Sequence, residues 1–419
     1  MNTVARTDLL PRALAIRVFF CFASGYLLSY ALRSVNAVIA PELVNQFGLS
    51  NAQLGALSSA YFLAFAALQL PLGVWLDRYG SRNTDAALLL IAAVGCLVFA
   101  LAPDRHVLWV GRALIGAGVC GALMASLRVF RFWYAQERQQ QLAAWMLVIG
   151  SLGALSATVP VQWAMTSIGW RGVFGLVALL LTCSSAAIFW LVPREPARPV
   201  QSLSSQWAGY LRVFRSAYFW RFAIAAVAFH SGFVAYQSLW MGPWFTQVLG
   251  LSSAQSAQAL LVFNFVLMLG YLFLGWAAPR LASAGWSTLR TVGWGTALTL
   301  VAQLAIVFAH GASAWLLWLC LALGVTTYTL VQTHVSLTFP SELTGRAFSA
   351  FNLMLFVGMF AIQWLFGVLV DALSTVPAIG AGPPAFRVAL FLWVMVQLGA
   401  FAVMLGWRVQ PANEADVTR

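Results

Sequence analysis

An arginine inside an apolar segment is the residue whose type and position most clearly indicate chemistry in this chain. Arg33 lies between Leu32 and Ser34, eight residues before Pro41. A guanidinium stays charged in proteins, and a charge in an apolar segment is costly, so it usually faces a cavity or a partner. Asn36, three residues further on, shares its face if the segment is helical. We therefore expect Arg33 and Asn36 to face a cavity or a partner, which makes both candidates for binding a ligand, with a snorkelling or structurally hydrogen-bonded arginine as the alternative.

Further polar and aromatic side chains lie in other apolar segments. Such groups can donate hydrogen bonds to a solute, although polar side chains between helices also hold helices together. His230 and His334 titrate near neutral pH, which makes them candidates for proton coupling; a hydrogen-bonded core histidine is the alternative for each. Every carboxylate, in contrast, lies in a tail, a loop or the end of an apolar segment. The further candidates for binding the solute are His230, Gln237, Trp240, Asn264, Gln332 and Gln363.

The sequence also argues against several kinds of function. The chain contains no lysine, so a phosphate-binding loop that requires this residue is impossible. No Ser-His-Asp arrangement and no zinc-ligand spacing occurs, and each of the five cysteines stands alone in an apolar segment. We therefore expect no enzyme, no metal site and no cofactor.

The elements that position these residues are apolar helices. The chain has 419 residues, of which 62% are hydrophobic and 8% charged, far from the polar surface that a soluble domain needs. A membrane-spanning helix needs roughly 20 mostly apolar residues, and the sequence predicts an all-α membrane protein with twelve of them. We expect the spans near residues 15–40, 53–76, 84–102, 107–131, 140–166, 171–192, 219–247, 254–278, 287–309, 313–338, 347–372 and 384–407.

The arginines predict the orientation of these spans. With both termini in the cytoplasm, most of the 23 arginines lie on the cytoplasmic side, as the positive-inside rule requires. The net charge of +12 then reflects topology and contact with anionic lipid. No clustered basic face on a soluble element suggests nucleic-acid binding. We expect a multi-pass protein of the inner membrane.

An internal repeat predicts two related halves. Residues 48–53 (GLSNAQ) match residues 250–255 (GLSSAQ) at an offset of 202. The least hydrophobic interior stretch, rich in proline and serine, divides the spans six and six. We therefore expect an N-terminal half at 1–192, a cytoplasmic linker at 193–217 and a C-terminal half at 218–419, with a cavity between the halves.

A charged turn between the second and third spans carries a further pattern, formed by Gly73, Asp77, Arg78, Gly80 and Arg82. We expect the Asp77 carboxylate to accept hydrogen bonds from Arg82 or from backbone N–H groups that open a neighbouring helix. The glycines would allow a sharp turn and a close approach of helices. A capped loop with topology-setting arginines is the alternative.

The fainter second copy of this turn has Pro279 in place of the aspartate, beside Arg280. We expect the contact made by this turn to be weaker or absent in the second copy. The fourth span contains a further pattern, with Arg112 and Gly116 within residues 111–118.

Together, these motifs resemble those of the major facilitator superfamily, over about residues 13–408. The resemblance implies two pseudo-symmetric six-helix halves, with the charged turn at Asp77 as a gating loop that stabilises an outward-facing state. It assigns Arg112 to helix packing or proton coupling. Arg33 resembles the substrate-contacting arginine of the organophosphate and organic-anion branches. The equivalent position of the second half is Ala235, which favours a small anion with one charge over a phosphate ester.

The resulting hypothesis is a monomeric secondary transporter that moves a small anionic organic solute by alternating access. Without a nucleotide site, transport would depend on gradients, for example as symport. Efflux of amphipathic compounds is the alternative within transport, and a non-transporting solute sensor is the alternative of a different class.

Overall fold

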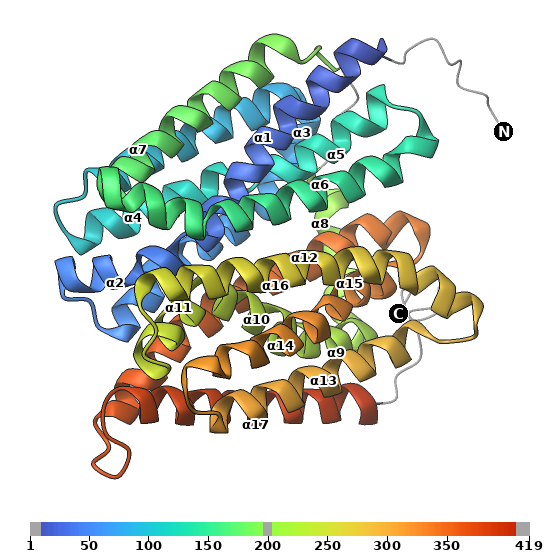
Figure 1. The fold of residues 1–419 in the computed structure, drawn as a ribbon. Coiled ribbons are helices and arrows are strands. Elements are labelled where there is room, and N and C mark those ends of the chain that lie inside the picture. Colours follow the sequence, from blue (N-terminus) through green and yellow to red (C-terminus); the bar gives the residue numbers. More distant parts are fainter. Residues whose placement is uncertain (1–9, 196–202, 408–419) are drawn as a thin grey trace. The chain divides into compact units, whose positions relative to one another are not determined.

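The computed structural model describes residues 10–195 and 203–407, and all regular structure within these ranges is helical (Figure 1). Ten of its helical segments are long and apolar enough to cross a membrane. The middle of the predicted linker and both chain ends lie outside the described residues. The prediction of an all-α membrane protein is confirmed for the described part of the chain.

The helices group into two compact units. Among the described residues, the first unit comprises 10–35 and 60–195, and the second comprises 36–59 and 203–407. Residues 36–59, which precede the linker in sequence, thus pack with the second unit. The assignment of 1–192 and 218–419 as the two halves stays a prediction.

The first unit is built around α1, which packs against α5, α6 and α7. Apolar residues make up most of α1, α3 and α7, so these helices bury apolar surface against neighbouring helices and lipid without a single amphipathic stripe. Its helices are α1 (Arg12–Ser34), the part of α3 (Asn51–Ala100) from Ala60 onward, α4 (Arg105–Gly118), α5 (Ala122–Trp133), α6 (Gln136–Ser156) and α7 (Val159–Leu191).

Two glycines bend the long helices of this unit. Gly80 in α3 has a φ of 77° and Gly169 in α7 has a φ of 65°. Side chains with a Cβ rarely adopt this region, so glycine permits each sharp turn. Each glycine lies between two predicted spans, and the helical segments divided there follow the predicted order. The count of twelve spans itself stays a prediction.

The second unit contains a distorted helical segment between Ala217 and Val248. Within it, three π-helical turns interrupt the α-helix, and such turns occur frequently at functional sites. The elements of this segment are α9 (Ala217–Ala226), η2 (Val227–Ser231), α10 (Gly232–Ala235), η3 (Tyr236–Trp240), α11 (Met241–Pro243) and η4 (Trp244–Val248).

The rest of the second unit surrounds this segment, with α16 and α17 packed against several of its turns. The remaining elements are α2 (Asn36–Phe47), α8 (Leu203–Arg215), α12 (Ser253–Ser283), α13 (Thr288–Phe308), η5 (Ala312–Leu316), α14 (Leu317–Val325), η6 (Thr326–Tyr328), α15 (Thr329–Leu337), α16 (Ser341–Ser374) and α17 (Pro383–Gly406).

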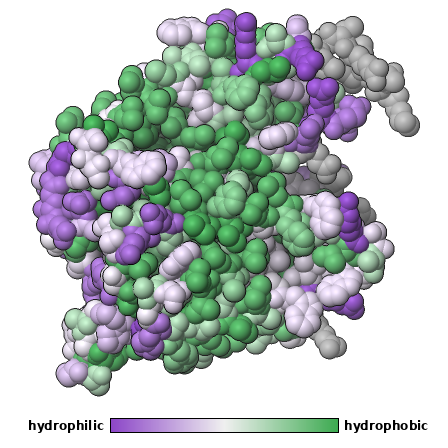
Figure 2. Space-filling model, viewed as in Figure 1, coloured by the Kyte–Doolittle hydropathy of each residue, from purple (hydrophilic) through white to green (hydrophobic). Residues whose placement is uncertain are grey.

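The surface of the helices is apolar where lipid would contact it. Large side chains such as Leu101 and Trp190 are 78% and 77% exposed. In both units, hydrophobic residues cover the middle of the visible helices and hydrophilic residues gather toward the helix ends (Figure 2). Because water penalises such apolar patches, this surface suits a bilayer.

Candidate functional site

Arg33 lies in the last turn of α1, where its guanidinium packs against aromatic rings. Its Cζ is 4.4 Å from the centroid of the Tyr30 ring and 6.0 Å from that of Phe65. A cation is attracted to the negative face of an aromatic ring. Tyr26 and Tyr61 also lie close enough to interact with its charge, and Tyr61 hydrogen-bonds to it. The first unit therefore holds a partly buried cation among three tyrosines.

None of these three tyrosines is among the residues that the sequence indicated for binding. Tyr26 and Tyr30 precede Arg33 by seven and three residues, which places both tyrosines on the same helix face as Arg33. This spacing could have identified these two residues from the sequence. The two rings meet edge-on, with centroids 5.0 Å apart. Tyr61 reaches α1 from α3 and donates its hydroxyl to the carbonyl oxygen of Ser29 at 3.3 Å.

Arg112 supports the same turn of α1 from α4. It is only 1% exposed, and its Nη1 donates to the carbonyl oxygen of Leu32 at 2.8 Å. A Cβ at Gly116 would lie 2.1 Å from the backbone oxygen of Tyr61, so glycine lets α4 approach α3 closely. The contacts of Arg112 and Gly116 are typical of helix packing, and the hydrogen bond of Arg112 fixes the backbone of α1 next to Arg33.

The second unit brings two pairs of predicted polar residues together. The Gln237 amide donates to Oδ1 of Asn264 at 2.7 Å, which joins η3 to α12. The Gln363 amide of α16 donates to the Ser238 hydroxyl at 3.1 Å. Among the described residues, Oε1 of Gln363 is buried and has no hydrogen-bond partner. This region therefore offers neutral amide groups.

Two other predicted binding residues are occupied by structural contacts. Trp240 is 1% exposed, and its indole N–H donates to the carbonyl oxygen of Gln363 at 3.0 Å. Asn36 is fully buried and donates to the Ser58 hydroxyl at 2.7 Å, within the second unit. Both contacts are typical of packing between helices.

The remaining predicted residues lie in separate surroundings. His334 of α15 pairs with the Tyr218 hydroxyl at 3.1 Å, and Gln332 donates to the carbonyl oxygen of Phe348 at 3.2 Å. His230 lies partly buried in η2. The roles of both histidines in proton coupling stay predictions.

The charged turn of α3 forms a cluster with α5 and the end of α7. Asp77 forms a salt bridge with Arg128, whose Nε lies 3.1 Å from Oε2 of Glu195. The backbone N–H of Ser81 donates to Oε1 of Glu195 at 3.0 Å. The left-handed turn at Gly80 presents this N–H to the carboxylate. We call Asp77, Ser81, Arg128 and Glu195 the Asp77 cluster.

The expected pairing of Asp77 with Arg82 is wrong. Arg82 donates instead to the carbonyl oxygen of Val192 at 3.3 Å, next to the exposed C-terminal carbonyls of α7, and stacks 4.8 Å from the Phe189 ring. The rotation of α5, which sequence spacing does not reveal, brings Arg128 to the carboxylate.

Other residues of the motif are exposed. A Cβ at Gly73 would meet no described atom within 4 Å, so the expected close approach at this glycine is not found. Arg78 lies 5.3 Å from the ring of its neighbour Tyr79. In the second copy, Arg280 donates to the carbonyl oxygen of Trp276 on its own helix.

A second carboxylate contact, not predicted from the sequence, lies at the beginning of α3 in the second unit. Asp371 of α16 accepts from the backbone N–H of Asn51 at 3.2 Å and of Ala52 at 2.8 Å. A carboxylate is favourable at the positive N-terminus of a helix. A Cβ at Gly367 would lie 2.3 Å from the backbone oxygen of Asn51, so glycine permits the approach.

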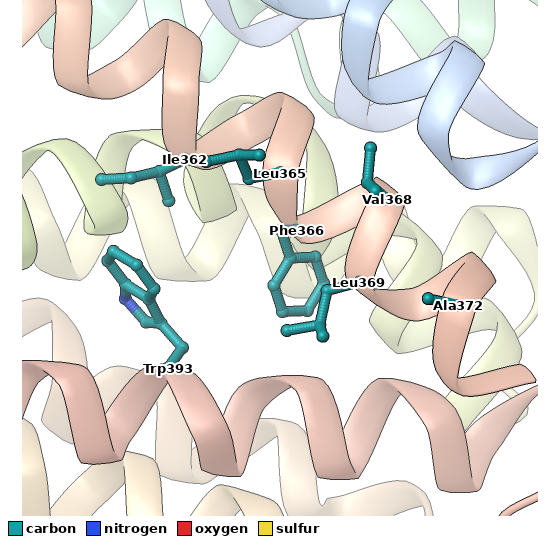
Figure 3. Close-up of a pocket in the computed structure, with 7 residues that line it drawn as sticks. All are labelled: Ile362, Leu365, Phe366, Val368, Leu369, Ala372 and Trp393. Atoms are coloured by element: carbon teal, nitrogen blue, oxygen red, sulfur yellow. The ribbon is translucent and has the colours of Figure 1, made fainter. Parts of the chain in front are cut away.

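A pocket between α16 and α17 is too apolar for an anion. It has a volume of about 390 Å³ and is lined by six residues of α16 and by Trp393 of α17. Figure 3 shows that the only polar atom drawn is the indole nitrogen. Without a cation or several hydrogen-bond donors, a buried anion would be costly. This pocket suits an acyl chain rather than the predicted solute.

Comparison with known proteins gives consistent matches. The profile described as "Major Facilitator Superfamily" matches residues 22–363. The protein named "Probable nitrate/nitrite antiporter NarK1" of Thermus thermophilus is 24% identical over 309 residues, which cover 71% of this chain and 67% of that protein. The hexuronate transporter of Escherichia coli K12 is 27% identical over 187 residues, which cover 45% of this chain and 43% of that protein. The chain thus spans less than half the length of this second relative.

Two further matches cover more of the chain. The gentisate transporter of Corynebacterium glutamicum is 23% identical over 350 residues, 80% of this chain and 76% of that protein. The crystal structure of a D-xylose–proton symporter superposes with a TM-score of 0.78 at 14% identity, covering 95% of this chain and 99% of that chain. At this identity, the structural match shows a common fold.

Proposed function

This chain belongs to the Major Facilitator Superfamily, a family of membrane transporters, and we propose that it moves a small anionic organic solute across the membrane by alternating access. The observation that carries the proposal is Arg33, a cation that lies over the Tyr30 ring and hydrogen-bonds to Tyr61 in the first unit. A guanidinium presents donors in a fork that matches a carboxylate.

The chemistry of the predicted binding residues in each unit supports an anion that also has hydroxyl or carbonyl groups. Tyr30 supplies an aromatic face to the cation, and the Tyr26 ring packs edge-on against it. In the second unit, Gln237, Asn264 and Gln363 supply amides that can bind neutral polar groups. The relatives are named for nitrate or nitrite, hexuronate and gentisate, all anions at neutral pH. A monocarboxylate with further polar groups fits this combination.

The Asp77 cluster suits a gate in this cycle. Its charge-assisted contacts tie α3, α5 and the end of α7 together within the first unit, and such contacts are roughly twice as strong as neutral hydrogen bonds. We assign this cluster to stabilising the outward-facing state. Asp371 of α16, which accepts from the first backbone N–H groups of α3, would act as a separate contact within the second unit.

The proposed location is a bacterial inner membrane, with both termini in the cytoplasm and the chain acting as a monomer. The bias of the arginines supports this orientation. The bacterial sources of the relatives support the location.

The test is uptake by purified protein in liposomes, offered labelled nitrate, glucuronate and gentisate separately. We expect the wild type to accumulate at least one of the organic anions and Arg33→Ala to lose that uptake, because removing one partner of a buried charge contact costs about 2–5 kcal/mol. Arg105→Ala removes an exposed arginine at the start of α4 and is the matched control. Uptake by Arg33→Ala equal to that of the control would contradict the proposal.

A further inference from the structure

Asp85 is a fully buried carboxyl group to which no role has yet been given. It lies in α3, five residues after the turn at Gly80, and is 0% exposed. Neither of its carboxyl oxygens has a hydrogen-bond partner among the described residues. The sequence placed it at the end of a span, where water would solvate it. The structure instead buries it.

The surroundings of Asp85 are apolar or neutral. At Gly121, a Cβ would lie 2.8 Å from a methyl group of Leu88, 3.3 Å from one of Leu72 and 3.4 Å from Oδ1 of Asp85. On the neighbouring face, α7 is held to α3 by the Ser185 hydroxyl, which donates to the carbonyl oxygen of Ala86 at 2.7 Å. The packing at Gly121 and the contact of α7 with α3 enclose the carboxyl group of Asp85.

Two arginines of the surrounding elements make contacts with other groups. On α5, Arg128 is held by Asp77 and Glu195, and on α3, Arg82 is held by the carbonyl oxygen of Val192. The thiol of Cys120, between α4 and α5, is also buried and lies next to Gly121, whose Cβ position faces Asp85. The thiol supplies no positive charge that would stabilise a carboxylate.

An ionised carboxylate in this position would be costly, because burial of an unpaired charge costs several kcal/mol. The neutral carboxylic acid avoids most of this cost. We infer that Asp85 is a proton-binding site that couples movement of the solute to protons, an inference that rests on the proposed function. The step is the ionisation of the carboxylic acid to a carboxylate, with the proton passing to water.

The Asp77 cluster provides the link to conformation. Ser81 precedes Asp85 by one helical turn, and its backbone N–H holds Glu195 of the cluster. Opening of the cluster would admit water to this turn and allow Asp85 to release its proton. Proton binding therefore favours the closed cluster, and ionisation favours its opening.

Infrared spectroscopy of the purified protein tests the site without any substrate. We expect the wild type at neutral pH to show the C=O stretching band of a protonated carboxyl, and Asp85→Asn to lose it. Asp104→Asn is the control, because backbone N–H groups of Val107 and His106 hold the pKa of the exposed Asp104 below its ordinary value, so that it is ionised. The same band in Asp85→Asn would overturn the inference.

Transport tests the coupling. In liposomes with an imposed pH gradient, we expect accumulation of the transported anion to respond to the gradient in the wild type and in Asp104→Asn, but not in Asp85→Asn. Asp85→Glu keeps a carboxyl group and should retain both the band and the response, which separates loss of the proton site from misfolding. An equal response in Asp85→Asn would overturn the coupling. If the wild type moves none of the anions, the proposed function fails, while the infrared result still decides whether Asp85 binds a proton.

Discussion

The region around Arg33 in the first unit differs in charge from its predicted repeat around Ala235 in the second. Arg33 lies against the Tyr30 ring. At the repeat offset of 202, these two positions are Ala235 and Gly232. Ala235 is fully buried, and a Cβ at Gly232 would lie 2.9 Å from the indole nitrogen of Trp393. The second unit therefore has no room at Gly232 for a ring like that of Tyr30.

This difference indicates how the two units would divide the recognition of a solute. The first unit supplies one positive charge and aromatic faces. The second supplies neutral amides, including the hydrogen-bonded pair of Gln237 and Asn264. One guanidinium balances one negative charge. We therefore expect a solute with a single anionic group and further neutral polar groups.

After substitution of Arg33 itself, the largest loss of anion uptake is expected from substitution of Tyr30. Tyr30→Ala removes the ring beneath the guanidinium and makes the first unit resemble the second, where glycine holds this position. A cation–π contact contributes about 0.5–2 kcal/mol, so uptake of the anion at low concentration should fall by roughly 2- to 30-fold. Tyr30→Phe keeps the ring and should retain most of the activity. Equal losses in both variants would assign the effect to the hydroxyl instead.

A smaller loss of uptake is expected from a substitution in the second unit. Gln237→Ala removes a neutral hydrogen bond, which contributes about 0.5–1.5 kcal/mol, and should weaken uptake by roughly 2- to 12-fold. The preference for an anion over its uncharged methyl ester should stay the same, because the charge lies elsewhere. Competition measurements with the two forms check this. A loss of the preference for the anion in Gln237→Ala would contradict the assignment of the charge contact to the first unit.

The sequence predicted the helices and the cation but not the contacts between helices. Hydropathy located the spans because lipid and packing both demand apolar residues, and Arg33 was conspicuous as a charge among them. The partner of Asp77 was mispredicted because Arg128 follows it by 51 positions, and its approach depends on the rotation of another helix. Asp371 was missed for the same reason.

The burial of Asp85 shows a second limit. Its place near the start of a predicted span indicated solvation, whereas the turn at Gly80 and the packing of Gly121 enclose it. Distance along the sequence from a span end does not determine exposure, because neighbouring helices can cover that end. Tyr26 and Tyr30, in contrast, follow a helical spacing from Arg33 that the sequence contains.

The most direct test of the single-cation account is ligand-dependent thermal stability of the purified protein. Each organic anion, glucuronate and gentisate, is compared with its uncharged methyl ester, for the wild type and for Arg33→Gln. Binding to the folded state raises stability by mass action. We predict that the transported anion, and not its ester, raises the Tm of the wild type, and that Arg33→Gln loses this increase. An equal increase in Arg33→Gln, or an equal increase with the ester in the wild type, would contradict the account.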